Sequence, residues 1–309
     1  MWRQNWTSVN EFILLGFTTH PTLQHVLLVL CLAITLATMF GNSLIIYLVW
    51  VDSRLHTAMY FFIGNLSFLD MLFTMITVPQ MLVHLASGIN TITFNRCMAQ
   101  LNLTLSCGMT ECFILALMAY DRYVAICQPL RYPTIMRMQV CIQMAGACWL
   151  GGFFNAATLT VVTINFPFCG PNQINHFFCE EPAVLQLACM DTYIVKVLIF
   201  GLSVIVLMLP FTFIVISYIH IAKVVLSMHS ASGRQRAFST CATHLTVVTL
   251  FYSTIGFTYL QPQSSRVADQ EKRASVFYAL VSPMLNPIIY SLRNKDVKGA
   301  LAKAMGKVS

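Results

Sequence analysis

Seven long apolar runs dominate the chain, at about residues 26–50, 58–83, 98–120, 140–166, 194–221, 238–260 and 274–292. Each run is long enough to cross the hydrocarbon core of a bilayer as a helix, which takes about 20 residues. A helix also satisfies its own backbone hydrogen bonds, as lipid requires. Only 9% of the 309 residues are charged, which is too few to cover a soluble globule. The sequence therefore predicts an all-α membrane protein, a seven-transmembrane helix bundle.

The positions of lysine and arginine predict how the bundle is oriented, because cytoplasmic loops carry an excess of these residues. The segments after the first, third, fifth and seventh runs hold Arg54, Arg131, Arg137, Lys223, Arg234, Arg236, Arg293, Lys295, Lys298, Lys303 and Lys307. We therefore expect the N-terminus outside and the C-terminus in the cytoplasm. The net charge of +7 reflects this orientation. The sequence contains no basic patch interleaved with aromatic residues, so it gives no indication of nucleic-acid binding.

The chain reads as one domain over residues 1–309, since no linker or repeat interrupts the runs. Residues 1–25 form the extracellular N-terminus, 26–292 the helix bundle and 293–309 a cytoplasmic tail. Apolar residues and lysines in the tail predict a short amphipathic helix at the membrane surface. The segment Asn5-Trp6-Thr7 is a glycosylation sequon on the predicted outer side, so we expect a glycan on Asn5.

Four cysteines fall on the predicted outer side: Cys97, Cys169, Cys179 and Cys189. An even set in an oxidising compartment predicts two disulfides, and four cysteines allow three pairings. In a second interpretation His176, Cys179 and Glu180 bind copper or zinc, because their donor atoms suit such ions. A disulfide at Cys179 would consume the thiolate, so we expect a structural cysteine here.

Six short motifs follow one another in a specific order. They are Gly41-Asn42, residues 55–62 (LHTAMYFF), 118–127 (MAYDRYVAIC), Ser217-Tyr218, 236–245 (RAFSTCATHL) and 283–294 (PMLNPIIYSLRN). Together they resemble the signature of rhodopsin-like G-protein-coupled receptors and, in their longer forms, that of the olfactory receptors. The long outer loop at about 167–192 is similar to that of the branch that responds to volatile, mostly apolar odorants.

Three features depart from the family pattern. Ala58 replaces a usual proline, which at a first helical turn mainly presets the backbone. Ser253 replaces a usual glycine and adds bulk near the expected ligand site. The sixth helix lacks the Trp-x-Pro kink of rhodopsin-like receptors, because Tyr252 and Thr254 occupy those positions.

The resemblance implies a function. A protein of this kind binds a small volatile, mostly apolar odorant in the outer half of the bundle. It activates a heterotrimeric G protein of the olfactory stimulatory type, which raises cyclic AMP. It lies in the plasma membrane in contact with lipid, needs no cofactor and is not an enzyme. The resemblance also implies that Cys97 pairs with Cys179, which leaves Cys169 to pair with Cys189.

The resemblance further implies a G-protein switch at the cytoplasmic end, formed by Asp121, Arg122, Tyr123, Tyr218, Asn286, Pro287 and Tyr290. Arg122 follows Glu111 by about three helical turns, so both lie on nearly the same face of the third helix. Asp121 can hold Arg122 at rest. The sixth helix offers Arg234 and Arg236 there rather than an acid, so we expect the resting contact of Arg122 to lack a second anionic partner.

The family pattern also selects the residues of a ligand pocket in the outer half of the bundle. The third helix contributes Thr104, Leu105, Gly108, Met109 and Cys112, and the fifth contributes Ser203, Val206 and Leu207. The sixth and seventh helices contribute Tyr252, Ile255, Gly256, Tyr259, Val276 and Ala279. These side chains are mostly apolar with a few hydroxyls, which suits a small uncharged molecule.

Two carboxylates, Asp70 and Glu111, lie within apolar runs, where a charge costs about 2.5 to 3.5 kcal/mol on insertion scales. At helical rise Glu111 lies about 16 Å outward from Arg122, and Asp70 about 19 Å outward from Thr57, so they are at similar depths. Two adjacent carboxyls share a proton or bind a cation. We expect a sodium ion, with Asn42, Ser282 and Asn286 as further oxygen ligands, and leave the shared proton as the alternative.

Other classes of membrane protein fit the sequence less well. An amine receptor needs an acid where Thr104 stands, and an opsin needs a lysine well inside the last helix, where Lys272 lies only at the edge. A transporter would show related halves, and an enzyme would combine a nucleophile, a base and an orienting group. A non-olfactory rhodopsin-like receptor for another small lipophilic ligand is the main alternative, ahead of a transporter.

Overall fold

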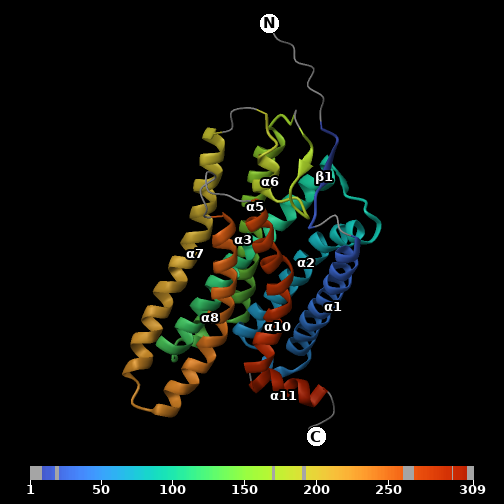
Figure 1. The fold of residues 1–309 in the computed structure, drawn as a ribbon. Coiled ribbons are helices and arrows are strands. Elements are labelled where there is room, and N and C mark those ends of the chain that lie inside the picture. The colour runs from blue at the N-terminus through green and yellow to red at the C-terminus, as the bar shows by residue number, and fades with distance from the viewer. Residues whose placement is uncertain are drawn as a thin grey trace.

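The computed structural model describes residues 9–17, 21–168, 171–189, 193–259, 268–293 and 295–304. Long helices run side by side, with short strands at one end and helix α11 at the other (Figure 1). The bundle consists of α1 (Pro21–Val51), α2 (Ala58–Ser87), α3 (Phe94–Cys127), α5 (Met138–Ile164), α7 (Tyr193–Ser227), α8 (Ala231–Tyr259) and a last segment made of α9 (Ala268–Val276), η3 (Phe277–Val281) and α10 (Ser282–Arg293). These helices coincide with the seven predicted runs and confirm the fold class.

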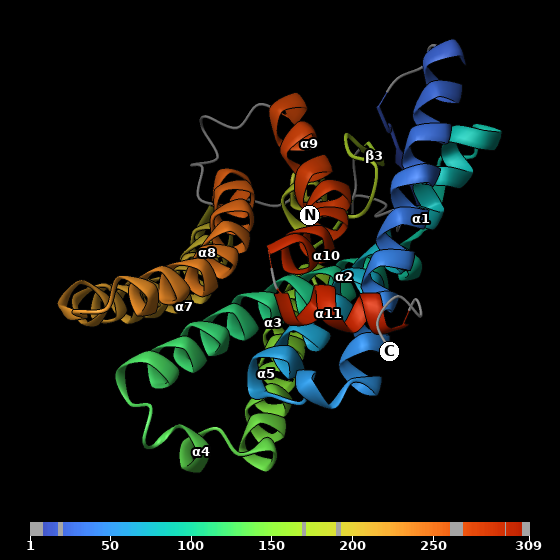
Figure 2. The same cartoon turned by 90° about the horizontal axis from the view of Figure 1, so that it is seen from below.

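Shorter elements connect or flank the bundle. They are η1 (Ser53–Leu55), α4 (Tyr132–Ile135), α6 (Glu181–Leu185) and α11 (Lys295–Ala304). Helix α11 lies across the end of the bundle, as the view from below shows (Figure 2). It buries Val297 and Ala300 and leaves Asp296 and Lys298 exposed, which is the amphipathic pattern expected of the tail.

Within the described residues, six helices are long and apolar enough to cross a membrane, and α8 is the bundle helix outside this set. It is more polar because it carries His244 and a series of threonines and serines. Their hydroxyls donate to carbonyls of the preceding turn, as from Thr246 to Ala242 at 2.7 Å and from Thr249 to Leu245 at 2.7 Å. Such bonds leave fewer unsatisfied polar groups than the composition of α8 suggests.

Several helices are longer than the apolar runs that predicted them. Helix α3 spans 34 residues, or roughly 50 Å at helical rise, against about 30 Å of hydrocarbon. Arg122 therefore lies inside α3 rather than where the helix stops. Pro79, Pro210 and Pro287 also lie inside helices, as expected of membrane segments.

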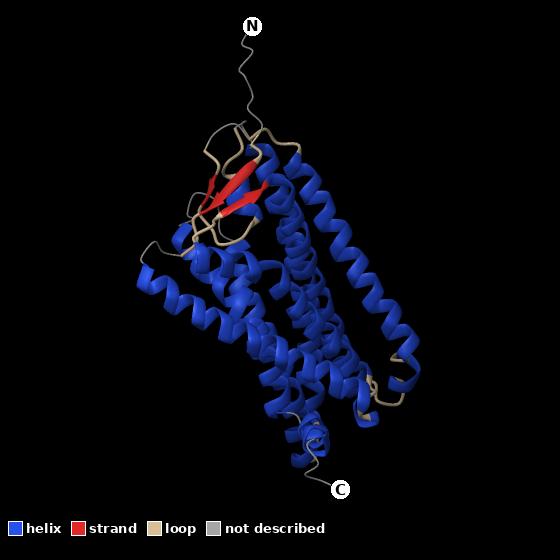
Figure 3. Ribbon diagram, turned by 90° about the vertical axis from the view of Figure 1, so that its right-hand side faces the viewer, coloured by secondary structure: helices blue, strands red, loops and turns tan. Residues whose placement is uncertain are grey.

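A small sheet caps one end of the bundle, and the sequence did not predict it. Strand β1 (Glu11–Leu14) pairs antiparallel with β2 (Thr91–Thr93) and parallel with β3 (Gln173–Ile174), in the order β2-β1-β3 (Figure 3). Phe12 is fully buried between the rings of Phe94 and Phe168. The expected disulfide joins Cys97 of α3 to Cys179 in the loop after β3, with an S–S distance of 2.01 Å.

Helix α3 occupies the centre, where it packs against α2, α5, α7 and α8. Its closest approach is to α5 at Gly152. A Cβ atom at Gly152 would lie 3.0 Å from the carbonyl oxygen of Ser106 and closer still to the hydroxyl of Thr110. Neither α3 nor α5 can move apart cheaply, because both also contact other helices.

We predict that Gly152→Ala destabilises the bundle, because the added methyl group forces α3 and α5 apart at a cost of about 1 to 3 kcal/mol. The measurement is the thermal unfolding midpoint of the purified protein, which should fall by several degrees. Gly146→Ala in the same helix is the control, since no described atom of a neighbouring element lies within 4 Å of a Cβ there. Equal midpoints for the two variants would contradict the packing argument.

Candidate functional site

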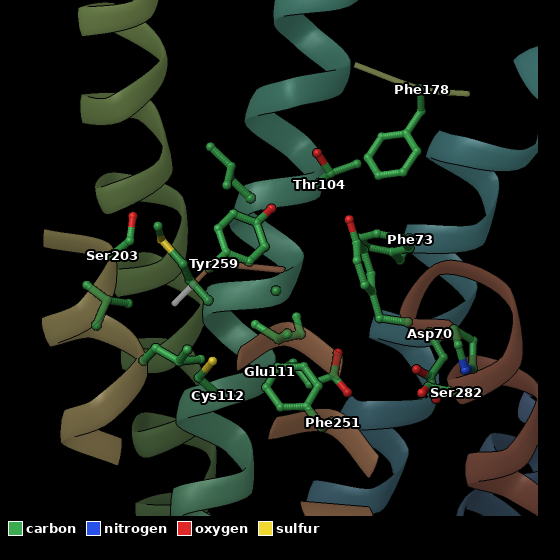
Figure 4. Close-up of a pocket in the computed structure, with 18 residues that line it drawn as sticks. Asp70, Phe73, Thr104, Glu111, Cys112, Phe178, Ser203, Phe251, Tyr259 and Ser282 are labelled. Carbon is green, nitrogen blue, oxygen red and sulfur yellow. The ribbon is translucent and has the colours of Figure 1, made fainter. Parts of the chain in front are cut away.

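A cavity lies within the bundle, between α2, α3, α7, α8 and the last helical segment. It encloses about 860 Å³ of empty space, part of it open to solvent. Phe178 of the loop after β3 lies at the capped side, whereas Glu111, Asp70 and Ser282 lie toward the opposite side (Figure 4). Because side chains from several helices converge on this space, it is the candidate binding site for a small molecule.

Ten of the fourteen residues predicted for a ligand pocket line this cavity. They are Thr104, Leu105, Gly108, Met109, Cys112, Ser203, Val206, Leu207, Ile255 and Tyr259. The residues that the family pattern selects on α3 and α7 therefore all border the same cavity. Whether a ligand binds there stays a prediction.

Four predicted residues do not line the cavity: Tyr252, Gly256, Val276 and Ala279. Tyr252 packs on the rings of Phe211 and Phe251, at centroid distances of 4.9 and 5.2 Å. Ala279 is fully buried in a cluster with Cys31 of α1 and Val78 of α2. Residues 277–281 form a π-helical turn, which changes which side chains face inward, so that Tyr278 faces the cavity instead.

Eight further residues line the cavity, and the pocket prediction had omitted them. They are Asp70, Phe73, Glu111, Phe178, Phe251, Tyr278, Ser282 and Pro283. Asp70, Glu111 and Ser282 had been assigned to a cation site instead. The others are mostly aromatic, so the walls are more aromatic than the sequence pattern indicated.

The carboxyl of Asp70 is buried and accepts hydrogen bonds from the side-chain amide of Asn286, at 2.9 and 3.2 Å. The amide of Asn42 donates to the carbonyl of Pro283 at 2.9 Å. Its own carbonyl oxygen, Oδ1, is buried without a hydrogen-bond partner in the described part of the chain. Among the described residues no three His, Cys, Asp or Glu side chains are grouped to hold a metal ion.

Arg122 and Asp121 form an ion pair of 3.0 Å near the end of α3 that is farther from the cap. Asp121 is fully buried and also accepts a hydrogen bond of 2.8 Å from the hydroxyl of Tyr132 in α4. Burial and the nearby Asp121 raise the pKa of Tyr132, so its hydroxyl keeps the proton that it donates. The connecting segment after α3 is thereby tied to the ion pair.

His244 of α8 links three helices, and the sequence analysis had assigned it no role. Its Nε2 lies 3.1 Å from the carbonyl oxygen of Leu115 in α3, and its Nδ1 lies 2.7 Å from the hydroxyl of Tyr218 in α7. A carbonyl oxygen only accepts, so Nε2 carries the hydrogen, and Nδ1 of the neutral ring accepts from Tyr218. An ionisable residue inside an apolar helix was the available signal.

The remaining switch residues lie close to this link. Tyr218 and Tyr123 are partly buried and pack against the same apolar cluster, which contains Cys241 of α8. The hydroxyl of Tyr290 in α10 is buried without a hydrogen-bond partner among the described residues. It can therefore gain a partner when the helices move, whereas Asn286 is already bonded to Asp70.

The loop that was considered as a copper or zinc site does not offer the thiolate that such a site needs. Cys179 is in the disulfide with Cys97, so its thiolate is not available. Nε2 of His176 lies 2.9 Å from Oε2 of Glu180 and forms an ion pair when the ring is protonated. Cys189 is disulfide-bonded, and its predicted partner Cys169 lies outside the described residues.

The structure has the features of a seven-transmembrane receptor of the G-protein-coupled class. It combines seven membrane-length helices with a cavity near one end and an ion-paired arginine near the other.

The family model described as "Olfactory receptor" matches residues 30–307. Human olfactory receptor 2G3 is 48% identical over 301 residues, or 97% of both chains. Human olfactory receptor 2D2 is 50% identical over 299 residues, or 97% of this chain and 96% of its own.

Mouse olfactory receptor 8U3 is 46% identical over 303 residues, or 98% of this chain and 95% of its own. The chain therefore belongs to the olfactory receptor family. It is an odorant receptor, a multi-pass protein of the plasma membrane that couples to a G protein and is not an enzyme. The resemblance seen in the motifs is confirmed, and neither a transporter nor a receptor of another family is retained.

We predict that His244→Ala raises basal signalling, because it removes the two contacts that join α8 to α3 and α7. At about 1 kcal/mol per hydrogen bond, the loss of both shifts the balance toward the open arrangement roughly thirtyfold. The measurement is cyclic AMP without agonist, normalised to receptor at the surface. His229→Ala in an exposed segment is the control. Unchanged basal cyclic AMP in the His244 variant would rule out this link as a resting contact.

Proposed function

We propose that the receptor binds a small, volatile, mostly apolar and uncharged odorant in the cavity between α3, α7 and α8. The observation that supports this proposal is the lining, which combines apolar side chains with few hydroxyls, among them Thr104 and Ser203. The hydroxyl of Thr104 donates to the carbonyls of Gln100 and Leu101, so toward a ligand it acts as an acceptor. The ligand is therefore held mainly by burial.

The expected affinity is modest. Burying about 200 Å² of apolar odorant surface contributes about 5 kcal/mol. One or two hydrogen bonds add about 1 kcal/mol each. Part of this is offset by the lost freedom of the ligand, so dissociation constants above the micromolar level are expected. Shape then decides which odorant fits.

We propose that odorant binding is transmitted to the cytoplasmic end through α8. Ile255 and Tyr259 line the cavity, whereas His244, about three turns away, contacts α3 and α7. An outward movement of α8 breaks the contacts of His244 and lets Arg122, Tyr218 and Tyr290 rearrange. The opened space takes the terminal helix of a G protein of the olfactory stimulatory type, which raises cyclic AMP.

The membrane arrangement belongs to the same proposal. The capped end faces outward, with residues 1–25 extracellular and a glycan on Asn5, and the helix α11 lies at the cytoplasmic lipid surface. Asn5 itself lies outside the described residues. The lysines of the tail favour anionic lipid at that surface. The arrangement is supported by the excess of Lys and Arg at the end of the bundle that carries α11.

We also propose that sodium binds between Asp70 and Glu111 in the resting receptor. The two carboxyls line the inner end of the cavity, and the amide oxygen of Asn42 is buried nearby in the same group of helices without a partner in the described chain. A cation there would allow both carboxyls to ionise at lower cost. It would stabilise the inactive arrangement, because the movement of the helices separates its ligands.

The function is tested by a cyclic AMP reporter assay across a library of volatile compounds. We expect uncharged odorants to raise cyclic AMP and their matching carboxylates to fail, since no basic side chain lines the cavity. Ser203→Ala should shift agonist potency by about threefold to tenfold through one lost hydrogen bond, at unchanged surface amount. If every agonist keeps its potency, Ser203 does not contact the ligand.

For the sodium proposal, we expect Glu111→Gln to abolish the effect of sodium on basal and agonist-driven cyclic AMP in membrane preparations. The amide has nearly the shape of the carboxyl but lacks its charge, so packing is retained while the cation loses a ligand. Replacing sodium by choline at constant ionic strength should then change the parent receptor only. The same sodium dependence in the parent and in the variant would exclude this site.

A further inference from the structure

The carboxylate of Glu180, next to the disulfide in the loop after β3, collects donors from several elements. The hydroxyl of Tyr278 in η3 donates to Oε1, as does that of Tyr259 at the end of α8, at 3.2 Å. The hydroxyl of Ser275 in α9 donates to Oε2 at 3.2 Å. Nε2 of His176 lies 2.9 Å from the same oxygen. Glu180 is only 4% exposed, so these contacts replace its water.

The loop that carries Glu180 is itself fixed to α3. Cys179 is bonded to Cys97, and its backbone amide donates to the side-chain carbonyl of Gln100 at 2.9 Å. The side-chain NH₂ group of Gln100 donates to the carbonyl of Ile76 in α2 at 2.9 Å. Glu180 therefore joins α8 and the α9 to η3 segment to a point that is rigidly held by α2 and α3.

The ring of His176 is oriented toward Glu180. Its Nδ1 accepts from the backbone amide of Phe178 at 3.3 Å, which leaves the hydrogen on Nε2, toward Glu180. Its ring stacks on Phe177 and meets Phe178 edge-on. Phe178 in turn lines the cavity. The contact between His176 and Glu180 and the aromatic wall of the cavity are thus parts of one packed unit.

Glu180 remains ionised in this setting. Burial alone would raise its pKa, but His176 and the hydroxyl donors outweigh burial, so that the pKa lies below the ordinary value. Hydrogen bonds to an ionised acceptor are shorter and stronger than those between neutral groups. The two tyrosines are therefore held more firmly than a neutral acceptor would hold them.

Tyr259 and Tyr278 both line the cavity, at the side where Phe178 closes it. A tyrosine has one hydroxyl hydrogen, and each of these donates it to Glu180. We propose that Glu180 is a positioning residue of the odorant pocket, which fixes the rings of Tyr259 and Tyr278 and makes the capped end a wall for the apolar chain of an odorant. This inference rests on the proposed binding site.

The geometry assigns a direction to the ligand. The polar group of the odorant lies toward the inner end, where Glu111 and Ser282 line the cavity, and its carbon chain points toward the fixed rings. A short odorant fills the inner part and does not reach the rings, whereas a longer homologue packs against them. Glu180 therefore determines how strongly the receptor distinguishes chain lengths, although it does not touch the ligand.

The experiment compares Glu180→Gln with the parent, using a short and a long straight-chain member of one agonist series, such as primary alcohols, in the cyclic AMP assay. The amide turns one acceptor oxygen into a donor, so the tyrosine rings lose their fixed position. We expect the potency of the long member to fall about tenfold and that of the short member to change less than about twofold. Glu11→Gln, an exposed carboxylate of the same cap, is the control.

Two further variants separate positioning from general damage to the fold. Glu180→Asp keeps the charge and should restore part of the preference for the long member. Tyr259→Phe on top of Glu180→Gln should add less than the two single effects combined, because both changes break one contact. An equal potency shift for both chain lengths, or full additivity, would overturn the positioning role while leaving the odorant receptor function intact.

A measurement without agonist keeps the inference testable if no alcohol activates the receptor. Backbone hydrogen exchange of purified, ligand-free receptor should be faster in Glu180→Gln than in Glu11→Gln at residues 173–185 and at the end of α8. Such a result would support the tether even if the library assay, and with it the proposed odorant class, failed. Equal exchange in the two variants would overturn the inference directly.

Discussion

The packing of α3 between its neighbours is the constraint on which the other features depend. One helix carries Cys97 of the disulfide at the capped end, the cavity residues from Thr104 to Cys112, and Arg122 of the ion pair near its far end. The close contact at Gly152 holds it against α5. Because α3 is fixed on several sides, we expect a change in the cavity to be transmitted through helices such as α7 and α8, which have side chains both in the cavity and at the contacts of His244.

Several buried polar groups connect one helix to another. Asp70 with Asn286 joins α2 to α10, His244 with Tyr218 and Leu115 joins α8 to α7 and α3, and Glu180 joins the loop after β3 to the last helices. In an apolar surrounding an unmade hydrogen bond is costly. Each of these groups therefore favours one arrangement of helices, and a movement must exchange their partners rather than simply break them.

Much of this organisation could be predicted from the sequence, and the failures have physical causes. Because α3 and α7 are regular helices, short motifs were enough to predict that residues such as Thr104 and Ser203 face the same space, and both line the cavity. The π-helical turn broke that regularity in the last helix, so Ala279 was predicted where Tyr278 faces inward. The capping sheet and the contacts of Glu180 join segments that are far apart in the chain. Such pairings could not be predicted, because the hydrophobic periodicity of a sequence carries no information about them.

The central claim is that an odorant must occupy the cavity beside α3 to activate the receptor. Gly108 lines that cavity, and no described atom of a neighbouring element lies within 4 Å of a Cβ placed there. Gly201 of α7 has similar open space but does not line the cavity. The most direct measurement is the agonist dose-response of Gly108→Leu beside Gly201→Leu at equal surface amount. We predict that only Gly108→Leu loses the response, and parental potency in that variant would contradict the account.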